Sequence, residues 1–223
     1  MYKRQELARA AGLNAATGKV VTIDDVNVAV IDRFDRTSTG RRIPYWSMAT
    51  FLQSTEDGYP PPCYTELNER LYLQADSLDK TTAKEIVGRL LLNYLINNTD
   101  DHGRNTGLLM RNNGVWVLSP AFDINPVPLS RPEAPYVSKN YLSLAEGEIE
   151  DVRQIWDNLA AFDLTDEEGV EIFKRVIGAV RNWKSLAVKP TVRMNASDLR
   201  DYAPAFSSVR LQKAVELAAR FEN

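Results

Sequence analysis

The strongest local pattern in the chain is an amphipathic helix that leads through a polar turn into a β-hairpin. Thr82 and Glu85 have the spacing of a capping box, and an apolar face at helical spacing follows them. That face consists of Ile86, Val87, Leu90, Leu91, Tyr94 and Leu95. Two strand-like runs, 106–110 and 115–118, then flank Asn112-Asn113-Gly114, which is a typical hairpin turn. We therefore expect regular structure on both sides of the polar turn.

The polar turn, residues 99–105, reads Thr-Asp-Asp-His-Gly-Arg-Asn. In-line transfer of a γ-phosphoryl group needs a carboxylate that orients the attacking hydroxyl and oxygen ligands for Mg²⁺. Asp100 and Asn105, with four residues between them, have the types and spacing of the base and the Mg²⁺-binding Asn of protein kinases. Asp123 lies beyond the hairpin and can supply the second carboxylate. The turn and Asp123 thus predict a phosphoryl-transfer site.

The same turn also fits a simpler interpretation. Asp, Asn and Gly suit turn backbones, so an Asp-Asp-His-Gly cluster between a helix and a strand is often only a solvated turn. His102 is the only histidine in the chain, and a lone histidine is usually a structural residue. One His and one Cys do not fill the tetrahedral shell of Zn²⁺, whereas carboxylate and amide oxygens suit Mg²⁺.

Four stretches of the sequence resemble the HipA family of bacterial serine/threonine kinases. They are residues 95–105 (LINNTDDHGRN), 118–126 (LSPAFDINP), 28–36 (VAVIDRFDR) and 42–47 (RIPYWS). The resemblance extends from about Glu6 to about Trp183 and is less distinct in the last forty residues. It implies a kinase fold and an ATP- and Mg²⁺-dependent activity.

The resemblance implies roles for four residues of the polar turn and for Asp123 beyond the hairpin. Asp100 would be the catalytic base. His102 and Arg104 would lie around the transferring phosphate, which also makes His102 part of the ATP site. Asn105 and Asp123 would be Mg²⁺ ligands and contact the nucleotide through the metal.

Upstream, the resemblance makes 28–36 the hinge between the two lobes of a kinase. Asp32 and Phe34 would then contact adenine through backbone groups. Without the resemblance, the segment is an ordinary strand closed by a charged turn, in which Arg33 and Arg36 form surface ion pairs of little energetic weight.

The start of the chain departs from the family. The nucleotide-phosphate loop and the strand lysine of such kinases belong before the helix at 6–13, whereas Lys19 comes after it. Residues 1–5 correspond to the translated end of a transposon adaptor used in sequencing libraries, so we expect them to be an artefact and the gene to be truncated. A natural helix start and a split kinase remain alternatives. The expected division is 1–5 artefact, 6–36 remnant of the small lobe and 37–223 helical large lobe.

Composition favours a cytoplasmic domain. The 223 residues, 44% of them hydrophobic, can bury one sizeable core. The single Cys63 fits a reducing compartment, and a net charge of -3 gives no basic footprint for direct nucleic-acid binding. No apolar run reaches the length of a membrane span. We expect a cytoplasmic protein that contacts neither membrane nor nucleic acid directly.

Helical patterns fill most of the remaining chain. We expect strands at 19–23 and 26–31, and helices near 45–54, 63–75, 82–97, 151–161, 166–183 and 205–221. Thr165 and Glu168 form a second capping box. Breaker-rich loops lie at 57–62 and 126–136, and the second is the natural place for substrate contacts. The predicted fold is α+β, mostly α: the large lobe of a protein kinase with a small β remnant of the amino-terminal lobe.

The expected function is transfer of the ATP γ-phosphate to Ser or Thr of a protein, with little activity in the isolated fragment. The resemblance further implies a toxin of a toxin–antitoxin pair, a HipB-like helix-turn-helix antitoxin as partner and a translation component as substrate. That step is an association by family. A catalytically inert HipA-fold binding module, half of a split kinase, and a metal-dependent hydrolase using Asp100, His102 and Asp123 stay open.

Overall fold

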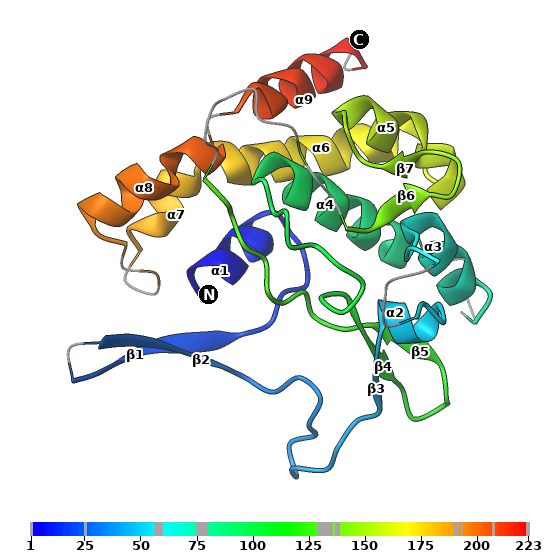
Figure 1. The fold of residues 1–223 in the computed structure, drawn as a ribbon, viewed down its shortest axis with the longest axis horizontal. Coiled ribbons are helices and arrows are strands. Elements are labelled where there is room, and N and C mark those ends of the chain that lie inside the picture. Colours follow the sequence, from blue (N-terminus) through cyan, green and yellow to red (C-terminus); the bar gives the residue numbers. More distant parts are fainter. Residues whose placement is uncertain are drawn as a thin grey trace.

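The fold is taken from a computed structural model of the chain. It describes residues 2–24, 26–55, 60–74, 80–128, 136, 139–189, 192, 194–206 and 208–221. Within these residues the fold is α+β and mostly α, as predicted from the sequence. Helices α4 (Thr81–Leu95) and α6 (Asp166–Arg181) pack against each other in the middle of the molecule (Figure 1), with α9 (Val209–Arg220) on one side and strands β1–β5 on the other.

The core lies around α4, because nearly every side chain of this helix is buried. Those residues are Ala83, Ile86, Val87, Gly88, Arg89, Leu90, Leu91, Leu92, Asn93, Tyr94 and Leu95. Around α4 and α6 lie α1 (Tyr2–Ala10), α3 (Tyr64–Tyr72), α5 (Val152–Asp157), the 3₁₀ turn η1 (Leu159–Phe162), α7 (Trp183–Ala187) and α8 (Ala196–Phe206). Burial on nearly every side places this helix in the interior, although Arg89 and Asn93 are polar. The element before the polar turn is therefore rigid.

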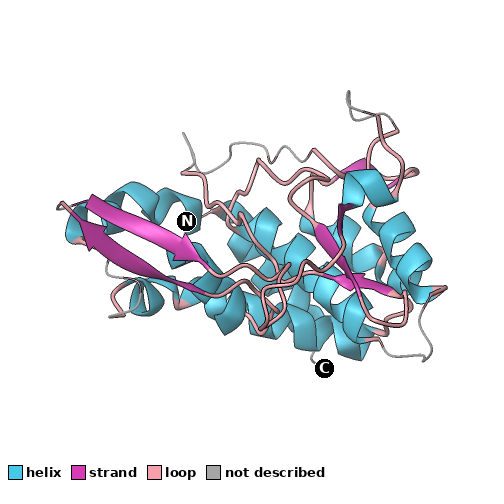
Figure 2. Ribbon diagram, turned by 90° about the horizontal axis from the view of Figure 1, so that it is seen from below, coloured by secondary structure: helices cyan, strands magenta, loops and turns pink. Residues whose placement is uncertain are grey.

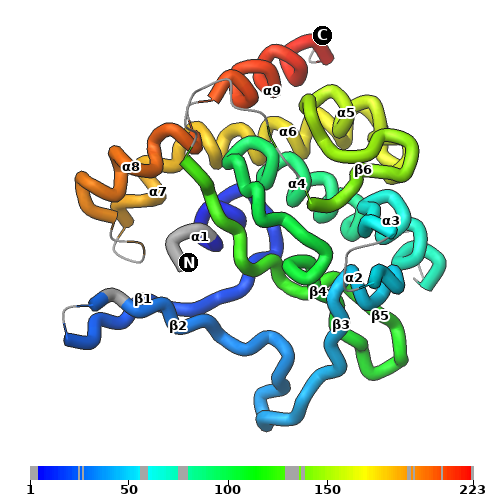
Figure 3. The backbone as a smooth tube through the Cα atoms, in the orientation of Figure 1, coloured from blue at the N-terminus to red at the C-terminus, as the bar shows by residue number. Residues whose placement is uncertain are grey.

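Three small antiparallel sheets complete the fold. Strands β1 (Gly18–Ile23) and β2 (Val26–Ile31) form a ribbon that projects from the helical body (Figure 2). Strands β3 (Tyr45–Ser47), β4 (Gly107–Met110) and β5 (Trp116–Leu118) form a sheet in that order. The third sheet pairs β6 (Tyr141–Ser143) with β7 (Gly147–Glu148). The tube in Figure 3 shows the long connection that runs from β2 to β3.

The helix predicted at 45–54 is wrong for its first three residues. Residues 45–47 form β3, which pairs with β4 from Tyr45↔Leu109 to Ser47↔Gly107. Only Met48–Phe51 is helical, as α2, and the Ser47 side chain caps it by accepting a hydrogen bond from the Thr50 backbone N–H at 3.1 Å. The pairing is with a strand about sixty residues away, which a local pattern does not reveal.

The capping box predicted at Thr82 is also wrong. Helix α4 begins at Thr81, and Lys80 at its N-cap makes no side-chain cap. Glu85 instead accepts hydrogen bonds from the Asn14 N–H, at 3.1 and 3.3 Å, and from Arg89. The carboxylate therefore serves a tertiary contact.

The second capping box is confirmed at α6. Thr165 Oγ1 accepts from the Glu168 N–H, and Glu168 Oε2 accepts from the Thr165 N–H. The prediction at 205–221 differs from the structure, because α8 ends at Phe206 and α9 begins at Val209. The sequence analysis missed α7 and most of α8, in which Pro204 lies inside the helix.

Two predictions concern residues at the margins of the described structure. Residues 2–5 are part of helix α1, which continues past residue 5 to Ala10. The expected division of the chain at residues 5 and 36 stays a prediction. Residues 57–59 and 129–135, which belong to the two predicted breaker loops, lie outside the described residues. In the part of the chain that the structure describes, every helix is too short or too polar to cross a lipid bilayer.

Candidate active site

The polar turn leaves α4 through a left-handed residue, Asn97, whose φ is 56°. Asn is one of the few residues that adopt this conformation readily, which explains why the helix ends here. The Asn97 side chain is held on both sides: its Nδ2 donates to Val127 O at 2.9 Å, and its Oδ1 accepts from both terminal nitrogens of the buried Arg210 at 3.0 Å. Helix α9 thereby fixes the start of the turn.

The end of the turn is fixed by α2. The Ala49 N–H donates to Gly103 O at 3.0 Å, and the Met48 N–H donates to Thr106 O at 2.8 Å. Gly103 has no room for a side chain, since an added Cβ would lie 2.7 Å from Pro62 Cγ. Because both ends are hydrogen-bonded to the core, the turn has a defined backbone.

Asp100 is half-exposed on this turn and pairs with a lysine. Lys139 Nζ lies 2.5 Å from Asp100 Oδ1. This hydrogen bond is the main cause that lowers the pKa of Asp100 below its usual range. Asn105 supports the same residue, because its Nδ2 donates to Asp100 O at 2.9 Å. The Asp100 carboxylate is therefore favoured in its ionised form by Lys139, while Asn105 holds the backbone carbonyl of the same residue.

The next residue, Asp101, is buried, with 4% of its surface exposed. Burial is the main cause that raises its pKa, and hydrogen bonds from Tyr64 and Asn93 oppose the rise. Tyr64 donates to Asp101 Oδ2 at 2.6 Å, and Asn140 Nδ2 donates to the same Tyr64 oxygen at 3.2 Å. The two adjacent aspartates thus have opposite environments.

Asp123 follows β5 in a left-handed conformation, with φ 52°. The backbone before it is tied to the amino-terminal segment, since the Ala121 N–H donates to Asn14 O and Ala121 O accepts from the Ala16 N–H. Asn125 Nδ2 donates to Asp123 Oδ1 at 2.9 Å, which leaves Oδ2 as the other oxygen of the carboxylate. The carboxylate is therefore oriented by its own turn.

A small polar cavity of about 20 Å³ brings Asn105 and Asp123 together, as the sequence predicts. Asn98 also lines it. Asn98 Oδ1 is buried and accepts no hydrogen bond from a described residue, and neither does Asn125 Oδ1, although Asn125 does not line this cavity. Buried oxygens without donors are satisfied by water or by a hard cation that takes oxygen ligands. Carboxylate and amide oxygens around one cavity fit Mg²⁺ better than Zn²⁺.

A larger cavity of about 440 Å³ joins the hinge to the same aspartate. Its lining includes Asp32, Phe34 and Asp123. The other lining residues are Gln5, Ile31, Arg33, Asp35, Tyr45 and Phe122. The Phe34 and Phe122 rings lie 5.5 Å apart between centroids, which gives the cavity an apolar wall. The Asp32 N–H already donates to Thr17 O at 2.8 Å, so Asp32 has its carbonyl oxygen left for a ligand.

Three predicted residues lie outside both cavities. Asp100, His102 and Arg104 line neither of them, and Arg104 is exposed. His102 is half-exposed, but its Nδ1 is buried and has no hydrogen-bond partner among the described residues. In the part of the chain that the structure describes, no three His, Cys, Asp or Glu side chains are grouped so that they could hold one metal ion, and this includes Asp100, His102 and Asp123.

The sequence analysis did not single out Lys139, Tyr64 or Asn125. Lys139 is 39 residues from Asp100, and Tyr64 is 37 residues from Asp101, so no local spacing connects them. Asn125, in contrast, lies two residues after Asp123 within a segment that was already recognised. An Asx side chain that close to a carboxylate in a turn is a signal that local reasoning can use.

The buried helix, the Asp-containing turn, the hairpin and the second aspartate after it have the arrangement of the large lobe of a protein-kinase-like fold. The sequence matches the HipA-like C-terminal domain over residues 3–184. The chain therefore belongs to the HipA-like C-terminal domain family.

Solved structures agree on the fold. A chain of the Shewanella oneidensis MR-1 toxin–antitoxin complex of HipA, HipB and operator DNA aligns over 99% of this chain and 54% of its own length, with a TM-score of 0.57 and 16% identity. The Helicobacter pylori proinflammatory kinase CtkA aligns over 100% of this chain and 86% of its own length, with a TM-score of 0.62 and 15% identity. This chain thus spans about half of the Shewanella chain. No curated protein is significantly similar to it.

Proposed function

We propose that this protein acts as an ATP- and Mg²⁺-dependent kinase that phosphorylates Ser or Thr of a protein substrate. The observation that carries the proposal is the position of Asp123, which borders both the hinge cavity and the small polar cavity of Asn105. A kinase needs a site for the base next to a site for the metal, since the metal binds the phosphates of the same nucleotide.

The hinge cavity has the chemistry that an adenine base requires. Its apolar wall of Phe34 and Phe122 offers ring surface for stacking. The Asp32 carbonyl would accept a hydrogen bond from the exocyclic amine of the base, because the Asp32 N–H is already engaged with Thr17. A cavity of about 440 Å³ lies within the range of small-molecule sites.

Asn105 and Asp123 would hold Mg²⁺ at the small cavity. The metal, when bound, neutralises charge on the phosphate oxygens. Hydrogen bonds already orient both side chains: Asn105 Nδ2 donates to Asp100 O, and Asp123 Oδ1 accepts from Asn125 Nδ2. The amide oxygen of Asn105 and Oδ2 of Asp123 are then the atoms available as ligands.

Asp100 would orient the attacking hydroxyl and take its proton. In this transfer the bond between the γ-phosphorus and the ADP oxygen breaks, and a bond to the Ser or Thr oxygen forms. The pair with Lys139 favours the ionised form of Asp100, which is the form that accepts a proton. His102 and Arg104, on the same turn, would lie around the phosphate as it moves.

At the level of the cell, we propose a cytoplasmic toxin of a toxin–antitoxin pair. The support is family membership and a structural neighbour that comes from a toxin–antitoxin complex of HipA, HipB and operator DNA. The partner would be a HipB-like helix-turn-helix antitoxin, and the substrate a translation component. Fold alone does not specify a substrate, so these assignments rest on association.

The decisive experiment measures ATP binding and γ-phosphate transfer with Asp123→Asn beside a matched control, Asp163→Asn. Asp163 also has a left-handed backbone, with φ 56°, but lies at the end of η1 and lines neither site cavity. We expect Mg²⁺-dependent nucleotide binding by the unaltered chain, a loss of about tenfold or more in Asp123→Asn, and none in Asp163→Asn.

Transfer is then tested in the same preparations, where we expect only weak autophosphorylation by the unaltered chain, with Asp100→Asn as a third variant. We expect Asp100→Asn to abolish transfer and keep nucleotide binding. Retained autophosphorylation in both Asp100→Asn and Asp123→Asn would overturn the site. Nucleotide binding without any transfer would favour the inert binding module, and absence of nucleotide binding would remove the kinase assignment.

A further inference from the structure

Two adjacent contacts join the Asp100 turn to the segment that begins at Lys139. Asp100 pairs with Lys139 on the surface. Their chain neighbours, Asp101 and Asn140, meet below the surface at the hydroxyl of Tyr64, at 2.6 and 3.2 Å. Asp100 and Lys139 are therefore each followed in the chain by a residue that is hydrogen-bonded to the hydroxyl of the buried Tyr64.

The buried hydrogen bonds at Tyr64 restrict the position of the exposed ion pair between Asp100 and Lys139. An exposed ion pair between flexible side chains contributes little, since ordering both side chains costs entropy. Here the backbone on each side is fixed, because Tyr64, Asp101 and Asn140 expose 2%, 4% and 0% of their surface. The segment after Lys139 is further tied to the core by the Tyr141 N–H, which donates to Pro62 O at 3.0 Å. Lys139 thus has a defined position beside Asp100.

That position suits an anion that approaches Asp100. A transferring phosphoryl group carries negative charge on three oxygens, and an ionised Asp100 alone would repel it. A lysine ammonium has three N–H donors, and one of them reaches Asp100 Oδ1. Half of the Lys139 side chain, 52%, is exposed, so the remaining donors are available to solvent or to a ligand.

We propose that Lys139 is a further residue of the transfer site. The hydrogen bonds of Asp101 and Asn140 with Tyr64 hold Lys139 beside Asp100, where it donates to the γ-phosphate of the bound nucleotide. Tyr64 acts through Asp101 and Asn140 and is a positioning residue. This inference rests on the proposed function and adds to it a specific contact with the last phosphate. The competing explanation is a surface ion pair that only steadies two loops.

The two explanations differ in which nucleotide they affect. A residue that contacts the γ-phosphate changes the affinity for a triphosphate more than that for a diphosphate, whereas a loop-steadying pair changes both alike. The quantity to measure is the ratio of the dissociation constants of Mg²⁺·ADP and of a non-hydrolysable Mg²⁺·ATP analogue, by calorimetry. Such a ratio needs no turnover and no protein substrate.

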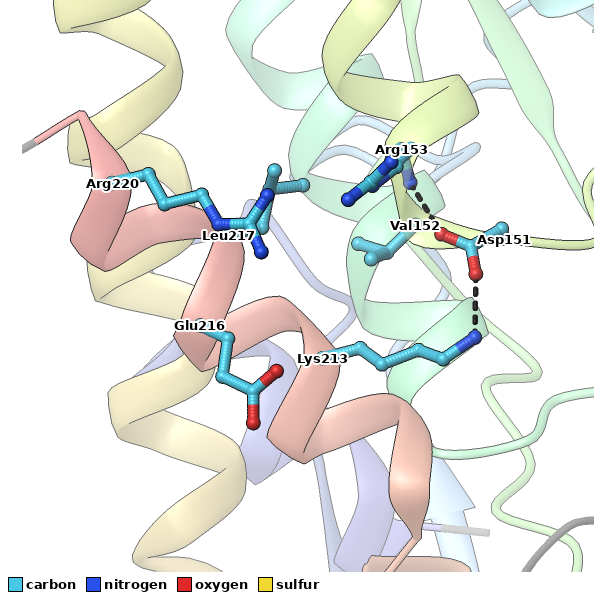
Figure 4. Close-up of a pocket in the computed structure, with 7 residues that line it drawn as sticks. All are labelled: Asp151, Val152, Arg153, Lys213, Glu216, Leu217 and Arg220. Carbon is cyan, nitrogen blue, oxygen red and sulfur yellow. Dashed lines mark hydrogen bonds and ion pairs between the residues drawn. The ribbon is translucent and has the colours of Figure 1, made fainter.

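Lys213 provides a matched control. It forms the same kind of ion pair, with Asp151 at 2.7 Å, and its side chain is also 52% exposed (Figure 4). The cavity of about 370 Å³ that it lines between α5 and α9 shares no lining residue with the two site cavities. Lys213→Met therefore removes an equivalent pair away from the site.

We expect Lys139→Met to reduce the preference for the triphosphate about tenfold, the loss of one charge-assisted hydrogen bond. Lys139→Arg should keep part of the preference, because the positive charge remains. Tyr64→Phe, which removes only the hydroxyl, should give a smaller reduction of the same ratio. Lys213→Met should leave the ratio unchanged, and circular dichroism checks that each variant is folded.

The outcomes separate the two proposals. If the unaltered chain binds nucleotide and Lys139→Met keeps its full triphosphate preference, the role of Lys139 is wrong while the kinase site stands. An unchanged ratio in Tyr64→Phe, with a reduced one in Lys139→Met, would remove the positioning role alone. If the unaltered chain binds neither nucleotide, the proposed function fails, and this inference fails with it.

Discussion

At the scale of single residues, Asp35 holds the hinge through two arginines. Its carboxylate lies 2.5 Å from Arg33 Nη2 and 2.6 Å from Arg36 Nη1, so the surface ion pairs considered from the sequence are present. The hydrogen bond from Arg33 is the main cause that lowers the pKa of Asp35 from 3.8 to about 2. A carboxylate whose pKa is lower in the folded state stabilises the fold above its unfolded pKa. That stabilisation is lost as the pH falls through the folded value.

Asp35→Asn should therefore lower the free energy of unfolding by about 1 kcal/mol at neutral pH, an amount already reduced for solvent screening. The difference from the unaltered chain should shrink between about pH 4 and pH 2, where the native carboxylate also becomes protonated. Urea unfolding at neutral pH and at about pH 3 measures both values. Arg33→Met should show the same pH dependence, and a loss of equal size at both pH values would contradict the assignment.

At the scale of elements, the two long carboxy-terminal helices differ in how they begin. Helix α6 has a complete capping box at Thr165. Helix α9 has Ser208 at its N-cap, but the hydroxyl makes no cap bond and is buried without a partner among the described residues. Thr165→Ala should therefore lower the free energy of unfolding by about 1 kcal/mol. Ser208→Ala should change it little, because the hydroxyl makes no such bond. Equal losses in urea unfolding would show that cap bonding does not distinguish the helices.

At the scale of the whole molecule, Arg89 joins three distant parts of the chain. Its side chain, 8% exposed, pairs with Glu85 at 2.7 Å and donates to Asn14 O at 3.2 Å and to Ser119 O at 2.8 Å. It thus connects α4 to the amino-terminal segment and to the stretch between β5 and Asp123. Arg89→Met should cost about 3 kcal/mol, since it leaves the mostly buried Glu85 carboxylate without its guanidinium partner and removes the donor to Ser119 O.

Thermal and urea unfolding of Arg89→Met measure that cost, with the double variant Arg89→Met, Glu85→Gln as the control. The double variant should recover part of the loss, because it removes the unpaired charge. Since Asp123 follows the segment that Arg89 holds, we also expect weaker nucleotide binding in Arg89→Met than in an equally destabilised surface variant. Unchanged stability would show that the buried pair only offsets its own desolvation.

Local sequence signals predicted the elements whose stability is local. The apolar face of α4 and the capping box at Thr165 place two helices, and Asn113-Gly114 places the turn between β4 and β5. The same hairpin led us to expect Asn105 near Asp123, and both residues line one cavity. Their role as Mg²⁺ ligands stays a prediction. These features depend on side-chain spacing and turn backbone preferences, which a sequence shows directly.

Only the tertiary structure decided the features that depend on distant partners. Residues 45–47 are a strand because β4 offers an edge for pairing, and Glu85 leaves its predicted cap because the Asn14 N–H and Arg89 bind it. Lys139 reaches Asp100 across 39 residues of chain, and the next residues of both segments, Asp101 and Asn140, contact Tyr64. Short-range periodicity carries no information on which remote group satisfies a buried polar atom, whereas burial makes that satisfaction energetically necessary.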